Sequence, residues 1–398
     1  MKINKFNGQR LKEALQFRGV RMTDLAKQTD ISKQSLSLYA NGENTPPFEN
    51  VEKIAKALDF PFDYFMTEDL CTTVTDNTYF RSQASASKLM QNAQKTKLEY
   101  VAKVYEVLLN YVDFPVRNLP PVLFQGTSNL LEADSDEILE QIERIASTVR
   151  SYWQIGMGPI DNMQYLLESN GIIVTGFPNV DSKIDAFSQR INVKGRETMF
   201  IVALALGDKS ATRLNFDMAH ELGHILMHNW NDSNDTLSKD EFNALEKQAN
   251  MFASALLLPR ETFGKAAGPY ATNVEFYRAL KKKWHVSMQA MMYRARQLNL
   301  VNANQFQYMM RTISANGERT HERGDMPGSL NSTIFQGAVE VLFDGGYLNS
   351  KQLMQAFHDY GIYLSQEDLE DIMGIKRGTL NVGPTVIPLF KPRTDIGN

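Results

Sequence analysis

The chain has 398 residues, of which 43% are hydrophobic and 22% charged, and its formal net charge is −4. The composition excludes wholesale disorder, and the length predicts two to four domains rather than one small core. The first residues lack the apolar segment of a signal peptide, no apolar run could span a bilayer, and the single cysteine, Cys71, allows no internal disulfide. We therefore expect a cytoplasmic protein that makes no membrane contact.

The first 66 residues show helical spacing of apolar positions, interrupted by turn residues at Gly19, at 30–32 and at Asn41–Gly42. They contain ten Lys/Arg against eight Asp/Glu, whereas the rest of the chain contains 32 against 38. We call residues 1–66 the head and the rest of the chain the body. A mildly basic head on an acidic body would orient the head toward DNA phosphates. The asymmetry is small, so it supports DNA binding only together with a binding motif.

Such a motif is present in the order of the head's elements. A helix over residues 22–28, a turn over 29–31 and a second helix over 32–39 are followed by Asn41–Gly42, which suits a left-handed helix end. This order resembles the Cro/C1-type (XRE) helix-turn-helix fold, and we assign residues 1–68 to it. The resemblance implies a double-stranded DNA operator, read by a homodimer on two half-sites.

Within this motif, Ser32 is placed to cap the recognition helix. Side chains in and after its first turn are placed to reach base edges, and flanking polar groups to hold phosphates. The DNA contacts that we expect are Lys33, Gln34, Ser35 and Ser37 on the reading side, with Arg21 and Asn44 on the backbone. The chain departs from the family at Arg21, where a Ser/Thr cap is common, and at Leu38, where a polar residue is common. The alternative is a helical domain that only holds partner proteins.

A polar stretch at residues 67–87 reads as a linker, and apolar spacing over 88–112 predicts a long amphipathic helix. That helix could supply the dimer surface or pack on its own chain. We assign residues 69–134 to this linker and helix.

A second compact region follows, with helices and three short strands. We expect strands at residues 171–174, 184–188 and 199–204, and helices at 138–149, 216–228, 240–258 and within 273–298. Residues 316–328 read as a second linker, and the tail is expected to be helical up to about Met373.

The most informative motif is H-E-x-x-H, formed by His220, Glu221 and His224. Residues four apart share a helix face, so both imidazoles can bind one Zn²⁺. Glu221 is then placed to act as general base toward the attacking water. The alternatives are two histidines that merely pack in a helix, or a metal bound without turnover.

A catalytic zinc needs a third protein ligand, and the next helix offers Glu246. Asn250, four residues later, would orient a ligand histidine. His228 is the rival ligand, but it lies about 80° around an ideal helix from His220 at roughly 100° per residue. We favour Glu246 and expect His228 to support the ligands. Either Arg213 or His228 could stabilise the oxyanion.

At these residues the sequence resembles the ImmA/IrrE family of zinc metallopeptidases. The resemblance covers roughly residues 138–300. It rests on WQIGMGPI at 153–160, IDAFS at 184–188, RLNFDMAHELGH at 213–224, EKQANMFA at 246–253, LLLP at 256–259 and LKKKWHVSMQA at 280–290. It implies one zinc per chain held by His220, His224 and Glu246, with Glu221 as the catalytic base. The chain departs from the family at Asn215 and Gln248, and neither departure removes a ligand.

Together these patterns predict a mainly α, multidomain protein. An all-α helix-turn-helix domain is followed by an α+β zincin-like domain with a small sheet at residues 135–300, and by a helical C-terminal region of unknown role at 301–398. The predicted function is a DNA-binding regulator whose zinc metalloendopeptidase cleaves a helix-turn-helix repressor, itself or a toxin/antitoxin partner, in stress, phage or mobile-element control. The alternative is a repressor or antitoxin that uses the zincin domain as a sensor or scaffold.

Overall fold

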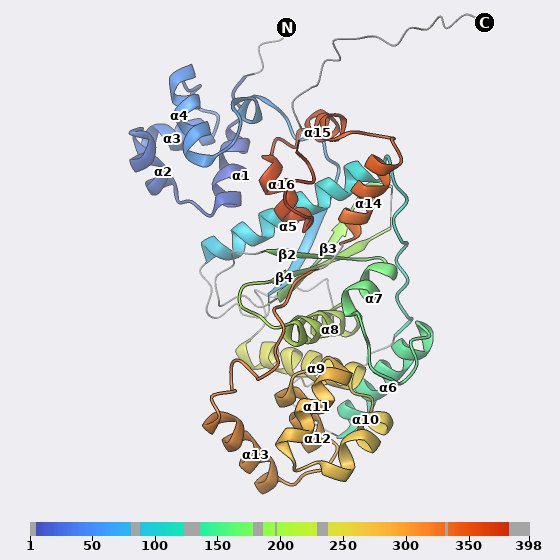
Figure 1. The fold of residues 1–398 in the computed structure, drawn as a ribbon. Helices are drawn as coiled ribbons and strands as arrows, with labels where there is room; N and C mark the ends of the chain where they lie inside the picture. Colours follow the sequence, from blue (N-terminus) through green and yellow to red (C-terminus); the bar gives the residue numbers. More distant parts are fainter. Residues whose placement is uncertain are drawn as a thin grey trace, which may run out of the picture.

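The computed structural model of the chain describes residues 5–80, 88–122, 136–177, 186–195, 197–228, 238–330 and 333–381. Helices dominate it, and a four-stranded sheet lies near the middle of the molecule (Figure 1). The predicted fold class is confirmed: a helical head, a central region with a small sheet, and a helical C-terminal region. Among the described helices, none is both long and apolar enough to cross a bilayer.

The head contains four helices and a short 3-10 helix. They are α1 (Gly8–Arg18), α2 (Met22–Thr29), α3 (Lys33–Ala40), α4 (Phe48–Leu58) and η1 (Phe62–Met66). Asn7 caps α1 and Ser32 caps α3, each through its side-chain oxygen. Helices α2 and α4 end at Asp30 and Asp59, whose φ angles of 57° and 54° are left-handed. These local signals explain why the helix order is readable from the sequence.

The sheet is mixed and has the strand order β1-β3-β4-β2. Its strands are β1 (Val74–Phe80), β2 (Ile172–Phe177), β3 (Ala186–Asn192) and β4 (Met199–Ala205). Strand β4 pairs parallel with β2 and antiparallel with β3, and β1 pairs antiparallel with β3, with Val74 opposite Asn192. The three strands predicted from the sequence are β2, β3 and β4, although each ends later than expected. Residues 184 and 185 of the second predicted strand lie outside the described residues.

Both faces of the sheet are covered, so its central strand is apolar on each side. In β4, Ile201 and Ala203 point into one buried cluster, whereas Phe200, Val202 and Leu204 point into the other. This alternation follows from the two-residue period of a strand. The sheet thus divides the molecule into two cores.

The first core joins the head, helix α5 (Lys88–Leu108) and the C-terminal helices to one face of the sheet. Those C-terminal helices are α14 (Ile334–Asp344), α15 (Ser350–Asp359) and α16 (Gln366–Met373). Helix α5 lies between α1 and the sheet and is largely buried (Figure 1). Of the two alternatives for this helix, a dimer surface or packing on its own chain, the structure therefore shows packing on its own chain.

Polar ties reinforce the junction between the head and the body. The Arg10 guanidinium donates to the Gly361 carbonyl oxygen at 2.7 Å. The Arg18 guanidinium binds both carboxylate oxygens of Asp368, each at 2.7 Å. Because both arginines sit on α1, this helix fastens the head to the C-terminal helices.

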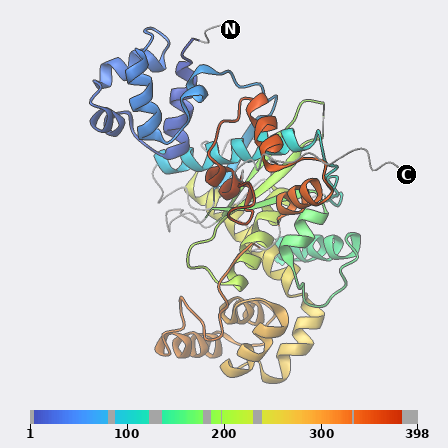
Figure 2. The same ribbon diagram turned by 45° about the horizontal axis from the view of Figure 1, so that its top comes forward.

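The second core covers the opposite face of the sheet. It contains α6 (Asp136–Tyr152), α7 (Met163–Ser169), α8 (Ala211–Met227) and α9 (Lys239–Leu257). Farther from the sheet lie α10 (Arg260–Ala267), η4 (Gly268–Tyr270), α11 (Val274–Trp284), α12 (Met288–Gln297) and α13 (Ala303–Ala315) (Figure 2). The predicted helices of this region are present with boundaries shifted by a few residues.

Two segments expected as linkers are built into the fold. Strand β1 lies within the polar stretch 67–87, because backbone pairing with β3 does not need an apolar side-chain pattern. Residues 316–328 also pack on the body: the Gly328 backbone N–H donates to the Lys209 carbonyl at 2.7 Å, and the Glu322 carboxylate accepts from the Lys281 ammonium at 2.9 Å. The prediction of a second linker is therefore wrong, and buried ion pairs are the reason. The division into domains itself stays a prediction.

Candidate metal centre and DNA interface

Helix α8 carries the H-E-x-x-H motif and packs against strands β3 and β4. Ser210 caps its first turn by accepting a hydrogen bond from the Arg213 backbone N–H at 3.3 Å. His220 and His224 are 0% and 2% exposed, and Glu221 is 1% exposed. The motif therefore lies in the interior, on a helix fixed to the sheet.

Helix α9 brings the third group. It starts with a capping box, in which the side chains of Ser238 and Glu241 each accept from the other residue's backbone N–H. It passes α8 closely at Gly223, where a Cβ atom would lie 3.0 Å from the Phe252 ring and 3.3 Å from the Ala249 Cα. A glycine at this position lets the two helices approach, and the approach places α9 beside the histidines.

Two imidazole nitrogens and one carboxylate group from the two helices meet at one point. The Nε2 atoms of His220 and His224 are 3.0 Å apart. Glu246 places Oε2 3.5 Å from the His220 Nε2 and Oε1 3.2 Å from the His224 Nε2. Among the described residues these three form a group that could hold a metal ion.

The spacing of the donors suits zinc. Bonds of roughly 2.0–2.1 Å in tetrahedral geometry put neighbouring donor atoms about 3.3 Å apart. The three separations, 3.0, 3.2 and 3.5 Å, bracket that value. Two imidazoles and a carboxylate are also a common donor set for catalytic zinc.

The other ring nitrogen of each histidine has a partner that fixes its tautomer. The Nδ1 of His220 lies 3.1 Å from the Asn250 Oδ1. Since an amide oxygen can only accept, His220 donates from Nδ1, and its Nε2 is the atom that would meet a metal. His224 has the same arrangement, with its Nδ1 2.7 Å from the Nδ1 of His228. The structure thus places Asn250 and His228 behind the two histidines.

His228 reaches this position because α8 ends at Met227. Its backbone is extended, with φ −105° and ψ 152°, so it leaves the helical path. Burial, and then the charge of His224, hold the pKa of His228 well below its usual value, while the Gln248 amide works in the opposite direction. A neutral His228 accepts the His224 proton at Nδ1. In this structure it meets His224 at Nδ1 and does not join the Nε2 donors.

Glu246 is held in its charged form. Burial acts to raise its pKa, but protons on the Nε2 atoms of His220 and His224, whose place a bound cation would take, outweigh burial and hold the pKa far below its usual value. A carboxylate that stays charged at neutral pH is what a cation site requires.

Asp217, near the centre, is not among the residues that the sequence predicts for the site. Asp217 is completely buried one turn before His220, and it pairs with Lys209 at 2.9 Å and with Arg213 at 3.2 Å. The family motif could have pointed to Asp217, because the position lies inside the matched segment. Arg213 is here an ion-pair partner of Asp217, and its side chain is 47% exposed.

The DNA contacts expected in the head lie on and around α3. Lys33, Gln34 and Ser37 are exposed on this helix, and Leu36, buried, anchors it. The Ser35 side chain is half-buried, and its hydroxyl lies 2.8 Å from that of Ser32.

The flanking residues Arg21 and Asn44 are exposed. Arg21 makes no side-chain cap on α2, which agrees with its departure from the family pattern. Gly42 has φ +72°, the left-handed conformation predicted after the recognition helix. Because α1 is the head helix that packs on α5, helices α2 to α4 lie on the side of the head away from the body (Figure 1).

Comparison with known families agrees with both regions. Residues 11–65 match a helix-turn-helix family model. Residues 172–296, from β2 into α12, match the peptidase M78 model, described as the IrrE N-terminal-like domain. No curated protein matches the chain. The chain therefore joins a helix-turn-helix domain of the XRE type to an IrrE N-terminal-like domain that contains the His220, His224 and Glu246 group.

Proposed function

We propose that this chain is a DNA-binding transcriptional regulator that is also a zinc metalloendopeptidase, and that it cuts a helix-turn-helix repressor or another protein partner. One observation carries the enzymatic part. Two imidazole nitrogens of helix α8 and one carboxylate of helix α9 lie 3.0–3.5 Å apart. The buried Glu221 directly follows the first of these histidines in the sequence.

His220, His224 and Glu246 would hold the zinc, and Asn250 and His228 would keep the two rings oriented. A bound Zn²⁺ supplies Lewis acidity, which polarises the scissile carbonyl and makes a water more acidic. Glu221 accepts the proton of the attacking water at its carboxylate and passes it to the leaving amine. Because Glu221 is only 1% exposed, the local dielectric around it is low, which strengthens its electrostatic interactions.

The head would bring this activity to DNA. Lys33 and Gln34 are exposed on a helix whose opposite side is anchored by Leu36. Such a helix can enter the major groove and read bases. Two chains bound to two half-sites would form the homodimer that we propose.

The test compares Glu221→Gln with the wild type and with Glu137→Gln, a matched change at an exposed glutamate. Metal content is measured by plasma mass spectrometry and cleavage with a quenched peptide library. We expect one zinc per chain in all three proteins and cleavage only in the wild type and Glu137→Gln. Equal cleavage by Glu221→Gln would remove Glu221 from the mechanism, and absence of stoichiometric metal from the wild type would refute the metal centre.

A second candidate is a repressor or antitoxin without proteolysis, in which the zincin domain is a sensor or scaffold. The head and the body share one core, in which Phe17 of α1 packs edge-on to Tyr100 of α5, with 5.2 Å between ring centroids. This shared core favours the sensor or scaffold role, because a change in the body could reach the DNA-binding head through it. In that case the wild type would bind zinc and DNA but would cut no member of the library.

A further inference from the structure

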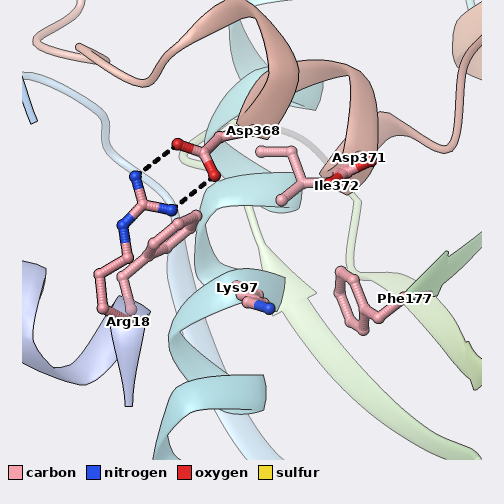
Figure 3. A pocket seen from close by; sticks show the side chains of 7 residues that line it. Arg18, Lys97, Phe177, Asp368, Asp371 and Ile372 are labelled. Atoms are coloured by element: carbon pink, nitrogen blue, oxygen red, sulfur yellow. Dashed lines mark hydrogen bonds and ion pairs between the residues drawn. The ribbon is translucent and has the colours of Figure 1, made fainter. Parts of the chain in front are cut away.

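A small pocket lies at the junction between the head and the body, on the sheet face opposite the metal centre (Figure 3). Its volume is about 240 Å³, and helices α1, α5 and α16 and the end of strand β2 enclose it. The residues that line it are Phe17, Arg18, Lys97, Phe177, Asp368, Asp371 and Ile372. Head and body therefore both contribute to its wall.

Lys97 is the side chain whose surroundings indicate that the pocket binds a ligand. Its ammonium lies 5.5 Å from the Phe177 ring centroid and 6.0 Å from that of Phe17. In the part of the chain that the structure describes, no carboxylate lies within ion-pairing distance of this ammonium, and no acceptor is hydrogen-bonded to it. Burial lowers the pKa of Lys97. An ammonium in such surroundings has three donors to offer.

The other charges of the pocket are already occupied. The Arg18 guanidinium is bound to Asp368 at two points and also donates to the Leu58 carbonyl at 2.8 Å. Asp371 accepts from the Arg377 guanidinium at 2.8 Å. Arg18, Asp368, Asp371 and Arg377 are thus all paired. Among the described residues, the Lys97 ammonium has no charged partner at contact distance. The pocket lining carries two cations and two carboxylates, so its net charge is zero, but the hydrogen-bonding capacity of the Lys97 ammonium leaves a place for an acceptor.

We propose that this pocket binds a small carboxylate with an apolar body, whose carboxylate accepts hydrogen bonds from Lys97. The rings of Phe17 and Phe177 and the Ile372 side chain would surround the apolar part. The volume is below the 300–1,000 Å³ typical of drug-sized ligands, so it suits a short fatty acid or a one-ring aromatic acid.

The position of the pocket gives the ligand a regulatory consequence. A molecule there touches α1 of the head and α16 of the body at once, next to the Arg18–Asp368 ion pair. It therefore binds the docked head more tightly than a displaced head, and this difference would stabilise the docked arrangement.

Calorimetric titration of the full chain tests the proposal. The probes are butyrate, hexanoate and benzoate, each paired with its neutral amide. We expect the acids to bind saturably. The affinity for each amide should be lower than that for its acid by about tenfold or more, because a charge-assisted hydrogen bond is lost. Hexanoate above benzoate would indicate an aliphatic ligand, and the reverse order an aromatic one.

Variants locate the binding. Lys97→Met should weaken binding of the preferred acid about tenfold or more, and Lys97→Arg should retain most of it. Lys88→Met, at an exposed lysine on the same helix, should leave it unchanged. Hydrogen exchange should slow in α1 and α16 when the acid is bound. The proposal is overturned if no acid binds, if acid and amide bind equally, or if Lys97→Met binds like the wild type. None of these outcomes bears on the zinc centre, which lies in the other core.

Discussion

The Nδ1 atoms of His224 and His228 lie 2.7 Å apart, on the side of the His224 ring away from Glu246. One nitrogen must carry a proton and the other must accept it. With the proton on His224, its Nε2 lone pair faces the two other donor atoms. At the proposed metal site, His228 would therefore orient the ligand His224.

We predict that His228→Ala weakens zinc affinity by about 10- to 100-fold, the usual effect of removing a partner of a ligand histidine. Affinity is measured by competition with a chromogenic chelator. His321→Ala, which removes an exposed histidine elsewhere, serves as the control and should bind zinc normally. An unchanged affinity in His228→Ala would mean that this contact does not support the ligand.

The recognition helix gives a second prediction. Gln34→Ala should cost about 1–3 kcal/mol in binding to the preferred sequence and should leave non-specific binding nearly unchanged. The preferred sequence is first selected from a random duplex library, and affinities are then measured by fluorescence anisotropy. Gln16→Ala changes an exposed glutamine on α1 and should have no effect. If Gln34→Ala weakened binding to every sequence equally, Gln34 would be a phosphate contact.

The junction between head and body can be tested at Gly361. Its φ is +81°, and a Cβ atom there would overlap the Glu68 carbonyl oxygen and lie 2.7 Å from the Arg10 Nη2. Gly361→Ala therefore adds a steric clash of about 1–3 kcal/mol to the cost of a left-handed alanine. Gly346→Ala is the control, because φ is +68° there and the space around it is open; it should lose only about 1–2 kcal/mol. Urea unfolding measures both, and equal losses would show that the junction relaxes around the added methyl group.

Glu168 should make stability depend on pH. Burial raises its pKa to about 7, and the carboxylate accepts from the Ile334 backbone N–H at 3.0 Å. Because the folded pKa lies above the unfolded value of 4.5, folding favours the protonated acid. The folded state therefore loses stability as pH rises from about 4.5 to 7, by on the order of 3 kcal/mol.

The matched variant is Glu168→Gln, which keeps an acceptor oxygen but does not titrate. Between pH 5 and 8 the wild type should lose stability relative to this variant, as measured by the urea midpoint at several pH values. Parallel pH profiles for the two proteins would show that Glu168 ionises freely in the folded state.

Much of this protein follows from local sequence. The helix order of the head is marked by Ser32, Asp30 and Gly42, whose conformations depend on nearest neighbours along the chain. The pair of histidines is likewise local, since four-residue spacing on any α-helix places His220 and His224 on one face. The predicted third ligand, Glu246, lies on the next helix along the chain, and the resemblance to the family identifies its position.

Tertiary structure decided the rest. Strand β1 joins β3 across more than a hundred residues through backbone pairing, which a polar stretch does not reveal. Arg18 meets Asp368 across 350 positions, and His228 meets His224 only because α8 ends at Met227. The pocket around Lys97 exists because three helices and a strand pack there. Such contacts depend on how whole elements close on one another, so no periodicity or short motif in the sequence contains them.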